Sequence, residues 1–270
     1  MRIRLGISPF ALVVLGLAAL YFLIPLAATL LFSLDSSQTG KCCSLDAWSF
    51  VFHDGEFWSS LQTSLILAAE TIAISLLLLV PTVYWIHLRL PRMRPVMSFL
   101  ALLPFVIPPI VLAVGLLDVF RGSPSWFYDS PYGFLVGAYV ILAFPYMFFS
   151  LDAGFRAIDV HTLTEASHSL GAGTIRTLGK VILPNIRVAA LSGSFLALAI
   201  VMGEFTIASL ASFPTFPTYI EAVQQTQAYG AAAVSFLSFA LTWVAMGSLL
   251  LVGRGRPGRF AQLAGSRRGA

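Results

Sequence analysis

The sequence has little charge for its length of 270 residues. Asp, Glu, Lys and Arg make up 10% of the chain, against roughly 25% in an average soluble domain. Hydrophobic residues make up 58%, and the mean hydropathy is +0.87. A globule of this size needs polar residues to face water, so this composition excludes a soluble fold and predicts an all-α integral membrane protein.

Cysteine and the motifs of hydrolytic enzymes are also scarce. The two cysteines, Cys42 and Cys43, are adjacent, and adjacent cysteines rarely close a disulfide because the geometry is strained. Neither H-E-x-x-H nor G-x-S-x-G occurs in the sequence. The sequence therefore predicts no disulfide framework and gives no support to an intramembrane enzyme.

Two fragments resemble nucleotide-binding loops without completing them. Gly171 and Gly173 begin a G-x-G-x-x-G pattern, but Arg176 stands where the third glycine belongs. The pair Gly179-Lys180 resembles the end of a P-loop, but Thr174 replaces its first glycine and Val181 its hydroxyl residue. His161 and His168 have no metal-ligand spacing. We expect no cofactor, no metal and no catalytic residues in this chain.

Long hydrophobic runs dominate what is present. A spanning helix needs about 20 apolar residues. Six runs meet this length, at residues 8–32, 61–86, 95–120, 132–151, 188–211 and 230–252. They predict six transmembrane helices, and the first is too long for a signal peptide.

Basic residues alternate between the connections, which predicts the orientation of the chain. They precede the first span, lie between the second and third and between the fourth and fifth, and follow the sixth; the other loops hold only Lys41 and Arg121. The basic residues at these four places, all on the predicted cytoplasmic side, are Arg2, Arg4, Arg89, Arg92, Arg94, Arg156, Arg176, Lys180, Arg187, Arg254, Arg256, Arg259, Arg267 and Arg268. Both termini are expected in the cytoplasm. The net charge of +4 follows from this topology and does not predict nucleic-acid binding.

A polar, glycine-rich segment interrupts the hydrophobic sequence between the fourth and fifth spans. It reads TEASHSLGAGTIRTLGKVILP, residues 164–184, within a predicted cytoplasmic loop at residues 152–187. Helix-forming residues continue to Ser169, and the glycines after it favour a turn with positive φ. We predict two short helices joined by a glycine elbow, the second at residues 174–183 and broken by Pro184.

The same segment resembles the EAA signature of binding-protein-dependent ABC importer permeases. That signature is E-A-A, three residues, G, nine residues and I-x-L-P. Here Glu165-Ala166-Ser167 is followed after three residues by Gly171, and after nine more by the run 181–184. Serine replaces the second alanine and valine replaces the isoleucine, but the spacing and the place in the topology are kept.

The resemblance implies a type I ABC importer permease, with residues 1–270 forming one transmembrane domain in the bacterial cytoplasmic (inner) membrane. It implies that the EAA loop couples the chain to a separate ATPase. The residues that carry this role over are Glu165, Ala166, Ser167, Gly171, Ala172, Leu183 and Pro184. Glu165 either takes part in docking or stabilises its own loop. The implied partners are two ATP-binding subunits, a second permease that is identical or homologous, an extracytoplasmic substrate-binding protein and membrane lipid.

Acidic residues inside spans are costly and usually face a cavity or the protein interior. Glu204 and Glu70 lie near mid-depth, and with Thr206 they are the candidate lining of the translocation path. Alternatively, Glu204 pairs with a backbone amide or hydroxyl at a permease–permease contact. The "LPFVIPPI" run, residues 103–110, predicts a kinked third span, either beside a cavity or simply packed.

The "GEF" sequence at residues 203–205 resembles the branch of importers for polyamines, phosphonates, thiamine, ferric iron and oxyanions. A carboxylate in the path suits a cationic solute. The resemblance implies a small polar or charged solute such as a polyamine, an aminophosphonate, thiamine or ferric iron. A secondary transporter or channel subunit is the alternative, although such transporters usually contain an inverted repeat that this sequence lacks. After the fifth span, residues 212–223 predict a re-entrant segment or short helix.

Overall fold

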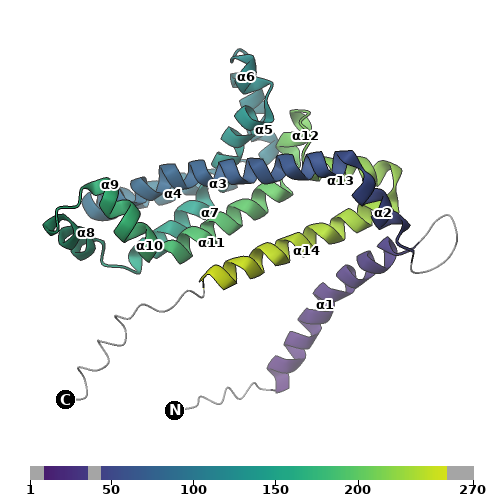
Figure 1. Cartoon of the computed structure of the whole chain (residues 1–270), viewed down its shortest axis with the longest axis horizontal. Coiled ribbons are helices and arrows are strands. Elements are labelled where there is room, and N and C mark those ends of the chain that lie inside the picture. Colours follow the sequence, from purple (N-terminus) through teal and green to yellow (C-terminus); the bar gives the residue numbers. More distant parts are fainter. Residues whose placement is uncertain (1–8, 36–43, 254–270) are drawn as a thin grey trace. The chain divides into compact units, whose positions relative to one another are not determined.

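The computed structural model describes residues 9–35 and 44–253, and its elements in these ranges are helices (Figure 1). The α-helices of the first half are α1 (Pro9–Ser33), α2 (Asp46–His53), α3 (Gly55–Arg89), α4 (Arg94–Val106), α5 (Pro109–Val119), α6 (Ser125–Tyr128) and α7 (Pro131–Arg156). The second half contains α8 (Val160–Ser169), α9 (Thr174–Thr177), α10 (Leu183–Asn185), α11 (Arg187–Gly203), α12 (Thr206–Leu210), α13 (Phe216–Thr226) and α14 (Ala228–Gly253). A 3₁₀ turn η1 (Pro91–Met93) precedes α4, and a π turn η2 (Leu178–Ile182) joins α9 to α10.

Within the described ranges, four helices are long and apolar enough to cross a membrane: α1, α3, α7 and residues 228–245 of α14. Two further pairs of helices qualify only when each bent pair is counted as one span, which gives up to six. The predicted all-helical membrane fold is confirmed, and six is the upper count. The predicted cytoplasmic termini, with the basic residues before position 9 and after 253, lie outside the described residues, as do Lys41, Cys42 and Cys43.

The third predicted span is broken rather than kinked, which corrects the expectation of one helix over residues 95–120. α4 and α5 meet at an angle of 97°. Ile107 and Pro108 have extended backbones, with ψ of 116° and 139°. Each of them precedes a proline, and the ring of a following proline excludes the helical conformation. Two consecutive prolines therefore stop one helix and start another.

The fifth predicted span, residues 188–211, is also interrupted. α11 ends at Gly203, Glu204 is extended with ψ of 111°, and the short α12 follows. At the other end, the prediction that Pro184 breaks the preceding helix is wrong, because helical structure continues to Asn185. The π turn before the proline lets the amide of Leu183 bond to the carbonyl of Leu178, and Pro184 needs no donor.

The chain folds as two compact units. Among the described residues, one unit contains those up to 63 together with 214–241, and the other contains 64–213 together with 242–253. In the first unit, Tyr219 on α13 packs on Phe57 and its hydroxyl donates to Asp54 at 2.7 Å. α13 confirms the short helix predicted after the fifth span.

In the second unit, α7 and α11 run side by side, with α8 to α10 at one end of both (Figure 1). Glycines allow this close approach. A Cβ built on Gly154 would lie 2.4 Å from the Cβ of Ala189, and one on Gly193 would lie 3.0 Å from the Sδ of Met147. The core around them is apolar and includes Met147, which is fully buried.

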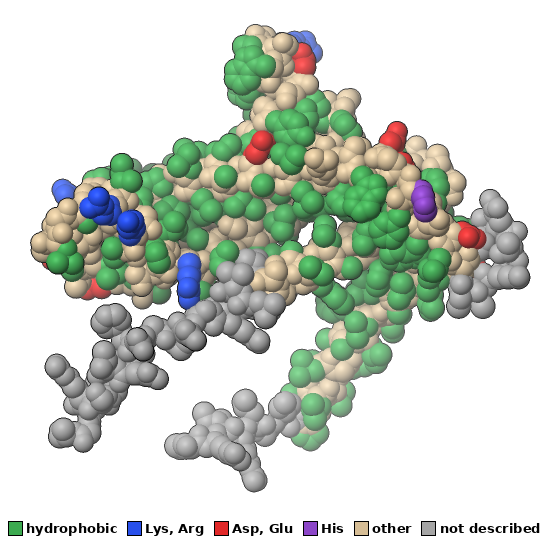
Figure 2. Space-filling model, viewed as in Figure 1, with side chains coloured by type: hydrophobic (Ala, Val, Ile, Leu, Met, Phe, Trp, Pro, Cys, Tyr) green, Lys and Arg blue, Asp and Glu red, His purple; other side chains and the backbone are tan. Residues whose placement is uncertain are grey.

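The outer surface matches a lipid environment better than water. Large apolar side chains are exposed along the candidate spans, among them Phe10 and Tyr21 on α1 and Leu77 on α3. Figure 2 shows hydrophobic side chains along the helices, and Lys and Arg side chains gathered at the end where α8 and α9 lie. This distribution agrees with the prediction that the polar segment lies at a membrane surface.

Candidate functional site

The polar segment, α8 to α10, forms a rigid elbow. Asp159 caps α8 by accepting from the backbone N–H and the hydroxyl of Thr162, at 3.1 and 2.7 Å. These bonds to the ionised form lower the pKa of Asp159. A carboxylate at this position also complements the positive end of the helix dipole. The start of α8 is therefore fixed by its own sequence.

Gly171 ends α8 in the left-handed conformation, with φ of 79°. Its amide bonds to the carbonyl of His168 at 2.9 Å, and the amide of Ala172 bonds to that of Ser167 at 3.1 Å. These two bonds make a Schellman motif, which satisfies helix carbonyls and needs a residue that tolerates positive φ. The glycine turn with positive φ that the sequence predicts is therefore confirmed at Gly171.

The residues expected to couple to an ATPase divide into two sets. Glu165, Ala166, Gly171, Leu183 and Pro184 are exposed, and Ala172 is half-buried. Ser167 is buried instead, and its hydroxyl lies 2.9 Å from that of Thr177 on α9. Ser167, the residue that departs from the family signature, thus joins the two arms of the elbow, α8 and α9, by a buried contact.

Two exposed apolar side chains flank the elbow and were missed by the sequence reasoning. Leu170 is 89% exposed and Ile175 is 90% exposed. An apolar side chain in a polar loop beside a glycine turn was the available signal. Within the described part of the chain, the carboxylate of Glu165 has no hydrogen-bond or ion-pair partner. The exposed surface of the elbow therefore carries this acidic group and two apolar side chains.

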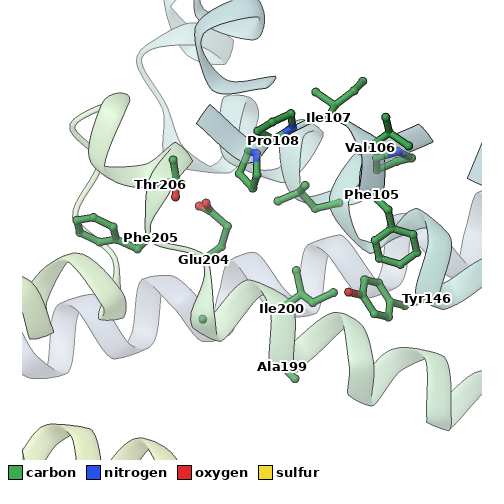
Figure 3. Close-up of a pocket in the computed structure, with 14 residues that line it drawn as sticks. Phe105, Val106, Ile107, Pro108, Tyr146, Ala199, Ile200, Glu204, Phe205 and Thr206 are labelled. Carbon is green, nitrogen blue, oxygen red and sulfur yellow. The ribbon is translucent and has the colours of Figure 1, made fainter. Parts of the chain in front are cut away.

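A second candidate site is a cavity of about 590 Å³ at the break between α4 and α5 (Figure 3). Phe105 and Tyr146 meet edge to face at 5.1 Å on one side, and Glu204, Phe205 and Thr206 lie on the other. None of the described residues that line it is basic. Of the three predicted path residues, Glu204 and Thr206 lie here, whereas Glu70 is not part of the lining.

Glu204 is held by the backbone at the start of α12. Its carboxylate accepts from the amide of Ile207 at 2.9 and 3.1 Å and from that of Ala208 at 3.4 Å. The side chain is 8% exposed. Pairing of Glu204 with backbone amides of its own chain is thus observed, while the carboxylate still lies at the edge of the cavity. Its place at a permease–permease contact stays a prediction. This capping is the reason that α12 starts where it does.

Polar groups buried near the middle of the unit lack partners. Among the described residues, Oε2 of Glu70 and the hydroxyls of Thr71, Ser75 and Tyr139 accept or donate no hydrogen bond. Buried polar atoms of this kind are rare and mark places where the interior is not purely structural.

A cluster of charged and polar side chains lies at the end of α7 that leads into α8. Asp152 on α7 accepts from both Nε and Nη2 of Arg94, at 2.8 and 2.9 Å, and contacts Nε2 of His87 at 2.9 Å. Arg156 lies 3.3 Å from the same carboxylate. Asp152 is buried, whereas the arginines are partly exposed. This ion cluster was not predicted, because only folding brings α3, α4 and α7 together.

The comparisons with known proteins agree with this geometry. Residues 87–255, more than half of the chain, match the family described as binding-protein-dependent transport system inner membrane component. The chain belongs to this family of permeases. It is a multi-pass membrane protein of the inner membrane and a transport subunit of the type I ABC importer class, as its EAA-like segment predicts.

Individual relatives give finer similarities. The permease is 27% identical over 247 residues to a probable molybdenum ABC transporter permease of Haloferax volcanii, covering 89% of this chain and 87% of the relative. It is 31% identical over 147 residues to a molybdate/tungstate permease of Pyrococcus abyssi, covering 54% and 57%. A spermidine/putrescine permease of Haemophilus influenzae is 29% identical over 169 residues, covering 57% of each chain.

A solved structure shares the fold. It is a bacterial alginate ABC transporter in complex with an alginate-pentasaccharide-bound periplasmic protein, matched with a TM-score of 0.65 at 16% identity. The match covers 91% of this chain and 94% of that one. The broken α4–α5 and α11–α12 segments thus belong to a permease fold that extends over nearly the whole chain.

Proposed function

We propose that this permease forms, with a second permease, the translocation path of an importer and takes its driving force from a separate ATPase through the segment α8 to α10. The observation that carries the coupling role is the rigid elbow with Leu170 and Ile175 exposed at its tip. Exposing two large apolar side chains in a polar loop is unfavourable unless a partner covers them. Glu165 beside them supplies a charge that orients the contact.

The docking proposal is tested by co-purification of the permease with its ATPase. Leu170→Ser and Ile175→Ser remove apolar contact without touching the Schellman bonds. We expect each to lower the yield of the complex, and the double substitution to abolish it, while membrane insertion is unchanged. Arg187→Ser, placed beyond the elbow at the start of α11, is the control. A double variant that retains the full amount of ATPase would refute the docking role.

We further propose that the solute is small and charged, with molybdate or tungstate as the first candidate. Two of the relatives above carry these names, and one of them matches nearly the full length of this chain. The cavity favours the second candidate, a polyamine. It has one carboxylate, aromatic rings from Phe105 and Tyr146, and no basic residue among the described lining, which suits a cation.

The measurement that separates these candidates is direct binding by the substrate-binding protein that serves this permease. Calorimetric titration with molybdate, tungstate, spermidine and putrescine, and with sulfate as a control oxyanion, gives the class at once. Micromolar or tighter binding of molybdate or tungstate alone supports the first candidate. Binding of spermidine or putrescine alone supports the second, and binding of none of them refutes both.

A further inference from the structure

The cytoplasmic end of α3 is attached to the docking segment by a buried hydrogen bond. The hydroxyl of Tyr84 lies 3.1 Å from that of Thr164 on α8. Tyr84 is fully buried and Thr164 is 4% exposed. Thr164 immediately precedes Glu165, so this bond holds the residue next to the start of the EAA-like signature. A hydrogen bond in such a dry position leaves a buried hydroxyl unpaired when it is lost.

The same two turns of α3 are also attached to α7. His87 contacts the Asp152 carboxylate at 2.9 Å, and its ring stacks on Phe155 at 5.6 Å. Phe155 is almost fully buried and also lies against the ring of Tyr84, at 6.4 Å. One small group of side chains therefore joins α3, α7 and α8.

The chain itself does not connect α3 to the docking segment. Three residues separate the end of α7 at Arg156 from the start of α8 at Val160, and one residue separates α10 from α11. A displacement of α8 to α10 therefore reaches α7 and α11 through the backbone. α3 ends at Arg89 and is separated from α8 by some seventy residues of sequence. It can follow the segment only through side-chain contacts.

The docking segment is built to move as one piece. The Ser167–Thr177 hydroxyl pair joins its two arms in a buried position, and Thr177 also donates to the carbonyl of Gly173 at 3.2 Å. The Schellman bonds fix the turn between the arms. Since the elbow is stiff, force applied at its tip is delivered to Thr164 rather than absorbed by bending.

We propose that the Tyr84–Thr164 bond is the link through which α3 follows the docking segment when the ATPase moves it, with Asp152 and His87 holding α3 against α7. Tyr84 and Thr164 are positioning residues for transport. This inference rests on the proposed docking of α8 to α10 on the ATPase. It adds that α3, which also packs on α7, is linked directly to the docking segment by a buried pair of hydroxyl groups.

The test compares two isosteric losses of the hydroxyl with one conservative replacement. Tyr84→Phe and Thr164→Val each remove one partner, and Thr164→Ser keeps the hydroxyl. Tyr132→Phe, on a half-exposed ring at the far end of α7, is the control for loss of a tyrosine hydroxyl. All variants carry Thr206→Cys in the cavity, with Cys42 and Cys43 replaced by serine.

The readout is the rate at which a charged maleimide labels this cysteine in the assembled transporter, with and without ATP and vanadate. We expect the parent rate to change strongly on trapping. Tyr84→Phe and Thr164→Val should each lower the ratio of the two rates about fivefold, which corresponds to about 1 kcal/mol for one net hydrogen bond. The double substitution should have no greater effect than either single one, and Thr164→Ser and Tyr132→Phe should match the parent.

Co-purification with the ATPase, measured on every variant, separates the possible failures. Parent-like ratios in Tyr84→Phe and Thr164→Val complexes would overturn the inference and leave the docking proposal intact. Effects that multiply in the double variant would also overturn it. If Tyr84→Phe fails to assemble, the contrast between Thr164→Val and Thr164→Ser decides. If the double variant with Leu170→Ser and Ile175→Ser retains the full amount of ATPase, the proposed function is refuted and this inference with it.

Discussion

Glu204 should stabilise the fold as a helix cap, and the size of this effect can be worked from its contacts. Its carboxylate accepts from two amides at the start of α12. Ile207 and Ala208, which own these amides, are fully buried, so water cannot replace the lost acceptor. Two substitutions separate the hydrogen bonding of the side chain from its charge. Glu204→Leu removes both acceptor oxygens, whereas Glu204→Gln removes the charge and keeps one acceptor oxygen.

The expected magnitudes differ between the two variants. A buried donor left without a partner costs about 1–3 kcal/mol, and loss of an N-terminal cap typically costs about 1 kcal/mol. We therefore expect Glu204→Leu to destabilise the permease by about 2–3 kcal/mol. Hydrogen bonds to an ionised acceptor are about twice as strong as neutral ones, so Glu204→Gln should cost about 1 kcal/mol. For a chain of this size, these values correspond to about 5–10 °C and about 2–4 °C in melting temperature.

The assay is thermal unfolding of the detergent-purified permease, followed by uptake in liposomes with the complete transporter. Glu221→Leu, at an exposed glutamate on α13, is the control and should change the stability by less than about 0.5 kcal/mol. A Glu204→Leu variant that melts with the parent would refute the capping role. If Glu204→Gln retains the parent rate of uptake, the carboxylate is a cap alone; a loss of uptake larger than its small destabilisation explains would assign it to the path.

Four further predictions follow from packing and charge. Gly154→Ala forces α7 and α11 apart and should cost about 1–3 kcal/mol in thermal unfolding, whereas Gly137→Ala on the same helix, where a Cβ meets open space, should be neutral. Gly171→Ala should cost about 1–2 kcal/mol and lower the yield of the ATPase complex, because φ is positive although the space is open. Asp152→Asn should destabilise by about 2 kcal/mol, since it leaves basic partners uncompensated. Burial and the hydrogen bond to the Asp54 carboxylate raise the pKa of the Tyr219 hydroxyl. The hydroxyl therefore contributes its full stabilisation below about pH 10, and this stabilisation is lost as the pH rises further. Tyr219→Phe should remove this alkaline step from curves of stability against pH, measured by thermal unfolding.

The sequence by itself determined the membrane class, the long helices and the elbow. Hydrophobic runs of about 20 residues leave no other environment for α1, α3, α7 and α14, because their backbone must be satisfied within each helix. The elbow was equally readable, since Gly171 is the residue that tolerates the positive φ of a Schellman turn. Both properties are local, and local properties are encoded in consecutive residues.

The breaks in the third and fifth spans were decided by interactions that a hydropathy pattern does not contain. Two consecutive prolines made a bend at Ile107 certain in principle, but its angle of 97° depends on what α4 and α5 pack against. No proline or run of charged residues in the sequence predicts the interruption after Gly203. It forms because the side chain of Glu204 turns back to cap α12, which a continuous helix would forbid.

Only the tertiary structure decided which side chains meet across the chain. Tyr84 and Thr164 are 80 residues apart, and His87 and Asp152 are 65 apart, yet each pair is in hydrogen-bond contact. No pattern within one helix predicts such a pair, because its free energy depends on the burial and geometry that the other helices create. The same reason explains why Ser167, a substitution in a surface signature by sequence, is a buried partner of Thr177 in the fold.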